Sequence, residues 1–191
     1  DLMKNKLPIK IKELLQKGTV IPAHPTALTE DLKIDSRRQR ALTRYYLDAG
    51  VGGIAVGVHT SQFEIREIGL YEEVLQLASE EIDLFTSKKN TEIIKIAGVL
   101  GATKQAVGEA EIAVKHNYHA ALLSLAALKD KSNEELIAHC KSIAEVIPLI
   151  GFYLQTSVGG QILDADFWCE FAKMENVVAI KMAPFDRYNT I

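Results

Sequence analysis

The chain has 191 residues, of which 48% are hydrophobic and 25% charged, with a formal net charge of −3 at pH 7. This length suffices for one domain with a substantial core. The slight acidity argues against a nucleic-acid or membrane-surface partner, because both require a basic face. No apolar run is long enough to span a bilayer, and the charged N-terminus lacks the apolar core of a signal peptide. We expect a cytoplasmic protein with a single domain over residues 1–191, in which residues 1–17 form a helical lead-in.

Strand-like and helix-like stretches alternate along the chain. The expected strands cover residues 18–24, 52–59, 92–99, 119–126, 148–154 and 176–182. The expected helices cover residues 37–50, 70–83, 103–117, 133–146 and 164–174. Helix caps support these boundaries: Asp35 or Ser36 starts the first of these helices, Gly50 ends it, and Ser132 or Asn133 starts the fourth.

This order amounts to about six βα units that repeat every ~30 residues, the size of a βαβ crossover. The strands are continuous apolar runs, which indicates a parallel sheet covered on both faces. A doubly wound open sheet and a (β/α)₈ barrel both fit. The first strand is followed by HPTALTED rather than GxGxxG. Polar residues instead end several strands, which is typical of a barrel active site: His24, His59, Ser124, Tyr153 and Lys181.

We therefore favour a TIM (β/α)₈ barrel with about six of its eight βα units in this chain. A full barrel needs two more units, and FDRYNTI reaches only the start of the next helix. We expect these residues to be the N-terminal part of a longer protein. The alternative is a complete, smaller open sheet, which would leave an exposed parallel edge strand.

The stretch NVVAIKMAPFD, residues 176–186, places Lys181 at the end of an apolar strand. If Lys181 and Tyr153 both face the barrel interior, an amine and a phenol meet in one apolar pocket. Burial lowers a lysine pKa from ~10.4 toward ~7–8, and the neutral amine then attacks a ketone or aldehyde to form a Schiff base. The alternative is an exposed strand-end lysine and a tyrosine of the core.

Five segments in register resemble the dihydrodipicolinate synthase / N-acetylneuraminate lyase superfamily, the pyruvate-dependent class I aldolases on a TIM barrel. They cover residues 26–54, 52–62, 96–123, 148–154 and 176–186. By this resemblance Lys181 is the Schiff-base lysine and Tyr153 the proton shuttle. The loop Val58, His59, Thr60 would bind the keto-acid carboxylate through backbone N–H groups. The resemblance also implies a small-molecule keto acid or aldehyde substrate, no cofactor, and a homotetramer built from dimers.

Three departures indicate a divergent member with another substrate. Val58 and His59 stand where the family loop has hydroxyl residues, and His59 is a candidate acid/base that replaces them. Val158 stands where synthases carry an arginine for the second substrate. The segment LSLAALKDK, residues 123–131, lacks the family's tyrosine pair. The expected function is a Schiff-base-forming lyase or aldolase that makes or breaks a C–C bond.

Other functions stay open. The departures also fit a catalytically idle barrel with a sensor or regulatory role. His116 and His119, with a third histidine, suggest a metal-dependent aldolase, but no carboxylate completes a recognisable ligand set, so no metal site is expected. The two cysteines, Cys140 and Cys169, form no CxxC pair, and we expect two small buried hydrophobes in a reducing cytosol rather than redox or nucleophilic thiols.

Overall fold

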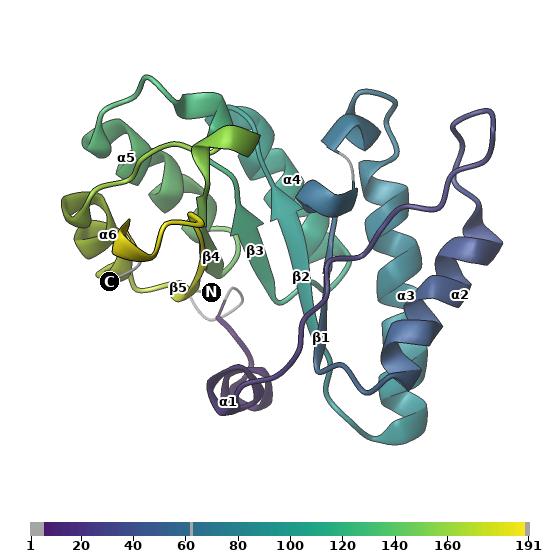
Figure 1. Cartoon of the computed structure of the whole chain (residues 1–191). Helices are drawn as coiled ribbons and strands as arrows, with labels where there is room; N and C mark the ends of the chain where they lie inside the picture. Colours follow the sequence, from purple (N-terminus) through teal and green to yellow (C-terminus); the bar gives the residue numbers. More distant parts are fainter. Residues whose placement is uncertain (1–5, 62, 190–191) are drawn as a thin grey trace. The chain divides into compact units, whose positions relative to one another are not determined.

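The computed structural model describes residues 6–61 and 63–189, in which strands and helices alternate (Figure 1). The strands are β1 Gly53–Val56, β2 Ile94–Val99, β3 Ala120–Leu123, β4 Leu149–Leu154 and β5 Val177–Ala183. The helices are α1 Ile9–Lys17, α2 Ser36–Asp48, α3 Tyr71–Lys89, α4 Thr103–Lys115, α5 Asn133–Ala144 and α6 Ala165–Ala172. Short 3₁₀ turns cover His59–Ser61, Phe63–Arg66, Ala126–Leu128, Thr156–Val158 and Arg187–Asn189.

The chain divides into two compact units. The N-terminal unit contains Leu7–Gly98 and Ile112–His119. The C-terminal unit contains Val99–Glu111 and residues 120–189. In the part of the chain that the structure describes, no helix combines the length and apolar composition that a membrane crossing requires.

In the N-terminal unit β1 pairs in parallel with β2, with Gly53 opposite Ile94. The prediction of a strand over residues 18–24 is wrong, but this segment does lie in parallel beside β1 and forms hydrogen bonds with it. The His24 N–H donates to the Ala55 carbonyl at 2.8 Å, and the Ala55 N–H donates to the Pro22 carbonyl at 2.9 Å. Only an isolated bridge forms, between Ala23 and Ala55. The reason is that Pro22 has no N–H with which to extend the ladder.

In the C-terminal unit β3 pairs in parallel with β4, and β4 with β5. Helix α6 covers one face of β4 at Gly151, where an added Cβ would lie 2.8 Å from the Phe171 ring and 2.9 Å from Trp168. Phe167 and Phe171 of α6 are almost wholly buried. The glycine therefore lets the helix approach the strand closely, and it marks this face of β4 as the one that packs on α6.

The helix caps follow the sequence with small shifts. Asp35 caps α2 by accepting from the Arg38 N–H at 3.0 Å, and Ser132 caps α5 in a reciprocal pair with Glu135. Gly50 has φ +84° but lies one residue past the Ala49 cap. The helix predicted from residue 70 to 83 runs on to Lys89, where Asn90 adopts the left-handed conformation that ends it.

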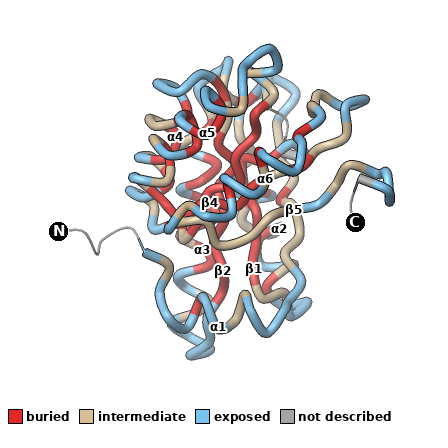
Figure 2. Tube along the Cα trace, turned by 90° about the vertical axis from the view of Figure 1, so that its left-hand side faces the viewer, coloured by how far each residue is buried: buried red, intermediate tan, exposed pale blue. Residues whose placement is uncertain are grey.

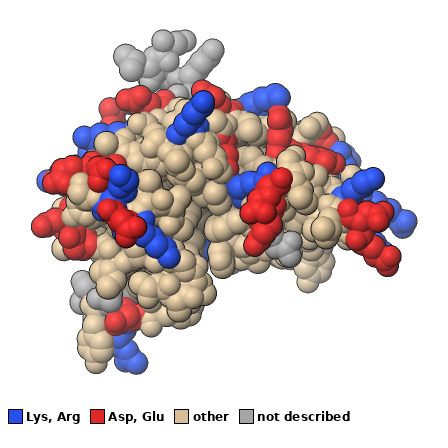
Figure 3. Space-filling view, turned by 90° about the horizontal axis from the view of Figure 1, so that it is seen from above, with Lys and Arg blue, Asp and Glu red and all other residues tan. Residues whose placement is uncertain are grey.

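The strands differ in how far their residues are buried. Every residue of β1, β2 and β3 is buried, which confirms the expectation of strands covered on both faces, whereas β5 is half-buried to exposed (Figure 2). Within the described residues β5 pairs only with β4, so its other edge forms no strand ladder there. On the face shown in Figure 3, basic and acidic side chains are interspersed rather than gathered by sign.

Candidate active site

Lys181 lies in β5 directly beside Phe152 of β4. The two residues are register partners, and the Lys181 Nζ is 4.7 Å from the centroid of the Phe152 ring. Partners at one level of a parallel sheet direct their side chains to the same face. The face that carries the amine is therefore the face of Phe152, opposite the one that packs on α6.

Tyr153 points the other way, and the expectation that it meets Lys181 in one pocket is wrong. Its ring packs against Trp168 of α6, with the ring centroids 5.5 Å apart, and the residue is only 6% exposed. It belongs to the same face as Gly151. Tyr153 is thus an aromatic residue of the helix–sheet interface, the alternative that the sequence left open.

A register shift causes this difference. Leu149 pairs with Val177, but Ile150 pairs with Ala179, so Val178 is an extra residue in β5. Without it, the count along the two strands would place Tyr153 opposite Lys181. A bulge of this kind moves every later residue by one position relative to its neighbour strand. Counting two residues along each strand cannot reveal such an insertion.

Two influences act on the Lys181 amine. Partial desolvation lowers its pKa, and the face of the Phe152 ring attracts its cationic form. The residue as a whole is exposed, so the burial expected for Lys181 is only partial in this structure, although the expected lowering of its pKa is present. Within the described part of the C-terminal unit no carboxylate forms an ion pair with Nζ, so no counter-charge holds the amine protonated.

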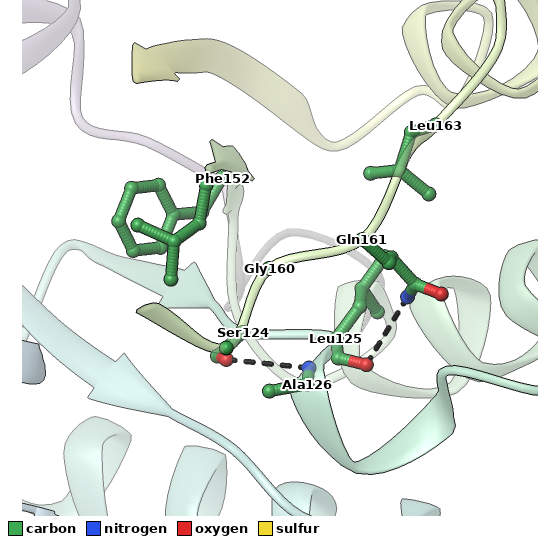
Figure 4. A pocket seen from close by; sticks show the side chains of 9 residues that line it. Ser124, Leu125, Ala126, Phe152, Gly160, Gln161 and Leu163 are labelled. Atoms are coloured by element: carbon green, nitrogen blue, oxygen red, sulfur yellow. Dashed lines mark hydrogen bonds between the residues drawn. The ribbon is translucent and has the colours of Figure 1, made fainter. Parts of the chain in front are cut away.

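A small cavity of about 10 Å³ lies beside Phe152 (Figure 4). It is lined by Ser124, Leu125, Ala126, Phe152, Leu154, Gly159, Gly160, Gln161 and Leu163. The loop after β4 closes it: the Gln161 side chain donates to the Leu125 carbonyl at 3.2 Å. Gly160 lies so close to β4 that an added Cβ would be 1.8 Å from the Leu154 carbonyl oxygen. Only glycine permits this contact.

The predicted carboxylate loop lies in the N-terminal unit. The Val58 side chain is buried at 4% exposure, whereas His59 and Thr60 are exposed and begin a 3₁₀ turn. The His59 ring meets the Phe63 ring edge to face at 5.1 Å. Backbone groups and the side chains of His59 and Thr60 are therefore what this loop offers to a ligand.

Sequence reasoning missed Arg66 and Tyr71, which hold the strand ends beside this loop. Arg66 Nη2 donates to the Gly57 carbonyl at 3.1 Å and to the Gly98 carbonyl at 3.0 Å. The Tyr71 hydroxyl donates to the Gly98 carbonyl at 2.7 Å, and its ring stacks under the guanidinium at 4.4 Å. Two glycines were the available signal: Gly57 directly follows β1, and Gly98 lies within β2 one residue before its end.

The histidines serve separate contacts. His116 Nε2 lies 3.0 Å from a Glu72 oxygen, and His119 Nδ1 accepts from the Lys95 N–H at 3.0 Å. His24 contacts Thr43, and His139 contacts Thr103. In residues 6–61 and 63–189, no group of three or more His, Cys, Asp or Glu side chains is arranged to hold a metal ion.

The two cysteines differ. Cys140 is buried, and burial raises the pKa of its thiol to about 12, which fits the expected inert hydrophobe. Cys169 is exposed on α6, so the expectation of burial is wrong for that residue.

Comparison with known proteins gives one family. A profile described as the Dihydrodipicolinate synthetase family matches residues 16–190. The 4-hydroxy-tetrahydrodipicolinate synthase of Methanosarcina mazei is 31% identical over 169 residues, which are 85% of this chain and 54% of that protein. The N-acetylneuraminate lyase 2 of Escherichia coli is 24% identical over 172 residues, which are 88% of this chain and 54% of that protein.

Solved structures give the fold. The dihydrodipicolinate synthase of Aquifex aeolicus superposes with a TM-score of 0.78 at 24% identity, over 90% of this chain and 57% of that one. The expected fold, part of a TIM (β/α)₈ barrel, is thereby confirmed, with five parallel strands in the described residues. The chain spans about half the length of the curated relatives that it matches.

Proposed function

We propose, from the premise that this chain belongs to the dihydrodipicolinate synthetase family, that it acts as a Schiff-base-forming lyase or aldolase on pyruvate or another 2-keto acid through Lys181. The family supports a lyase or aldolase in general, since its relatives here are a synthase and a lyase. The substrate and the catalytic role of Lys181 are the proposal, and they concern the whole protein.

The observation that carries the proposal is the placement of the Lys181 amine. Nζ is held over the Phe152 ring, desolvation lowers its pKa, and no carboxylate in the described part of its unit pairs with it. A larger fraction of the amine is therefore neutral near pH 7 than for an ordinary lysine, and the neutral form is the nucleophile.

The chemistry follows from that amine. The nitrogen lone pair attacks the keto carbon and gives a carbinolamine, and the former carbonyl oxygen then leaves as water. The resulting protonated imine draws electrons from the adjacent carbon, so that a C–C bond there can break or form. Hydrolysis of the imine returns the free amine.

The residue opposite Lys181 is Phe152 rather than the expected Tyr153. The position that faces the lysine has no hydroxyl, and Tyr153 lies on the α6 face. We therefore leave Tyr153 out of the proposed mechanism and assign no phenol to proton transfer. The residue five positions past Phe152 is Ser157, and five past Tyr153 is Val158, so neither count yields the arginine of the synthases.

Three further features stay proposals. Val58, His59 and Thr60 are proposed to bind the keto-acid carboxylate, chiefly through backbone N–H groups. A cytoplasmic homo-oligomer, a tetramer or dimer, is proposed from the resemblance alone.

The test is reductive trapping in the natural full-length protein. Incubation with pyruvate and borohydride should add one reduced pyruvate to the intact mass, and peptide mapping should place it on Lys181. The adduct should vanish in Lys181→Arg, while the control Lys173→Arg, an exposed lysine of the same unit, should keep it.

No adduct with pyruvate or with a panel of 2-keto acids and aldehydes would overturn the proposal. The catalytically idle barrel would then be the better account, because the missing hydroxyl at Phe152 already fits a barrel that has lost its chemistry.

A further inference from the structure

Ser124 continues the row of side chains that contains Lys181. Leu122 pairs with Ile150 and Leu123 with Gly151, so the next residue, Ser124, stands at the level of Phe152. Phe152 in turn pairs with Lys181. The Ser124 N–H donates to the Val99 carbonyl at 2.9 Å, which extends the ladder one residue past the end of β3. The three side chains therefore share one level and one face.

The Ser124 hydroxyl is buried and has spare hydrogen-bonding capacity. The residue is 7% exposed, and its Oγ accepts one long bond from the Ala126 N–H at 3.4 Å. Among the described residues, the hydroxyl donates to no acceptor. A buried polar group without its partner is costly, and such groups are uncommon unless water or a ligand completes them.

Ser124 lines the cavity beside Phe152. Its volume of about 10 Å³ is close to the minimum that one water-sized group needs. Figure 4 shows Ser124 and Phe152 at this cavity, with Gly160 and Gln161 of the closing loop beside them. The loop contact of Gln161 with the Leu125 carbonyl fixes the wall next to the serine.

Lys181 approaches the same place from the other side of Phe152. Two strand spacings separate Ser124 from Lys181, roughly 10 Å between backbones. The lysine side chain covers part of that span, because its Nζ already lies over the Phe152 ring. A small keto acid joined to Nζ as an imine would extend from there across the ring toward Ser124.

We propose that Ser124 determines which substrate this site accepts, by donating a hydrogen bond to a substrate oxygen other than the keto oxygen. The favoured class is a 2-keto acid with a hydroxyl or carbonyl on the substituent that lies over Phe152. The inference rests on the proposed function of Lys181. Its physical basis is that a site built to hydrogen-bond a substrate oxygen rejects the analogue that lacks it.

The test compares 3-hydroxypyruvate with 2-oxobutyrate, which differ by a hydroxyl in place of a methyl group. Trapping with borohydride gives an apparent KM for each. The natural protein should have a KM for 3-hydroxypyruvate at least tenfold lower. Ser124→Ala should abolish this preference, and Ser124→Thr, which keeps the hydroxyl, should retain most of it. The control Ser142→Ala removes a half-buried α5 residue's hydroxyl that bonds only the Ala138 carbonyl in the described structure, and it should change neither KM.

A purely structural serine would give another result. Ser124→Ala would then lower the melting temperature and weaken both substrates alike, and an unchanged preference would overturn the inference. If the natural protein forms no adduct with any keto acid, the proposed function fails. Calorimetric binding of the same two compounds to Lys181→Ala, with and without Ser124→Ala, then decides: a preference that depends on Ser124 supports the inference, and no preference overturns it.

Discussion

Two lysines in apolar strands, Lys95 and Lys181, show how the same sequence pattern yields two different groups. Lys95 of β2 is buried, and its Nζ donates to an Asp83 oxygen at 2.6 Å and to the Ser79 hydroxyl at 3.0 Å. Lys181 of β5 is exposed and lies over an aromatic ring. Desolvation lowers the pKa of both amines, but for Lys95 the Asp83 carboxylate acts in the opposite direction.

The difference shows that a lysine among apolar residues does not by itself indicate chemistry. Lys95 faces α3, whose side chains supply a carboxylate and a hydroxyl, so its charge is neutralised and its donors are used. Such an amine is held as a structural ammonium. Lys181 lacks these partners among the described residues of its unit, which leaves its amine available to a carbonyl compound.

The largest expected effect separates the two lysines by reactivity. Lys181→Arg should reduce borohydride-trapped pyruvate adduct at least a thousandfold, because a guanidinium is not deprotonated in proteins and forms no imine. Lys95→Met should leave the adduct at Lys181 intact in the folded protein. Intact mass measures both. If both variants lost the adduct equally while circular dichroism showed that both are folded, the two lysines would not differ in reactivity as we expect.

The next effect concerns stability. Asp83→Asn removes the counter-charge of the buried Lys95 ammonium. Because the Asp83 side chain is itself half exposed, we expect a loss of about 1–2 kcal/mol in the free energy of unfolding. Lys95→Met, which removes the charge itself, should cost less. Urea unfolding at pH 7 measures both, with the exposed Asp130→Asn as a control expected within about 0.5 kcal/mol of the natural protein. A negligible effect of Asp83→Asn would show that Lys95 does not depend on this pair.

His119, which accepts a hydrogen bond from the Lys95 N–H, should make the free energy of unfolding depend on pH. Burial, reinforced by the positive charge of Lys95, lowers the pKa of His119 to about 4, and Asp83 and Glu92 oppose this only in part. The unfolded chain, with a histidine pKa near ~6.5, therefore binds the proton more readily, and stability falls as pH drops from ~6.5 toward 4, by up to about 3 kcal/mol.

Unfolding free energies at pH 7 and pH 4.5 test this. His119→Gln retains an acceptor for the Lys95 N–H but does not titrate, so its stability should change less between the two pH values. His59→Gln, at an exposed site, should behave like the natural protein. A full loss of stability in acid despite His119→Gln would assign the effect to other groups.

The smallest expected effect concerns the environment of the Lys181 amine. Phe152→Ala removes two opposed influences, the desolvation that lowers the pKa of Lys181 and the ring face that attracts its cation. Because the net shift of this pKa is downward by desolvation, we expect the pKa to rise in the variant and the pH midpoint of adduct formation to move up by about 1 unit or less. Tyr153→Phe should leave both midpoint and rate unchanged, because its hydroxyl lies on the α6 face. A tenfold slower rate in Tyr153→Phe would contradict the observed register and restore the tyrosine to the mechanism.

Patterns within the sequence are enough to predict the alternation of strands and helices, most helix caps and the position of Lys181 in a strand. These follow from local rules: apolar runs form buried strands, and Asp35 or Ser132 satisfies free N–H groups at a helix start. Such rules act over a few residues and are visible in the chain.

The pairing of strands in the folded chain sets which residue faces Lys181. One extra residue, Val178, places Phe152 opposite the amine and turns Tyr153 toward α6. The fold likewise sets that Lys95 meets Asp83 and that Ser124 reaches the level of Phe152. Register and pairing depend on contacts between segments far apart in the chain, where a slip by one residue exchanges the two faces of a strand.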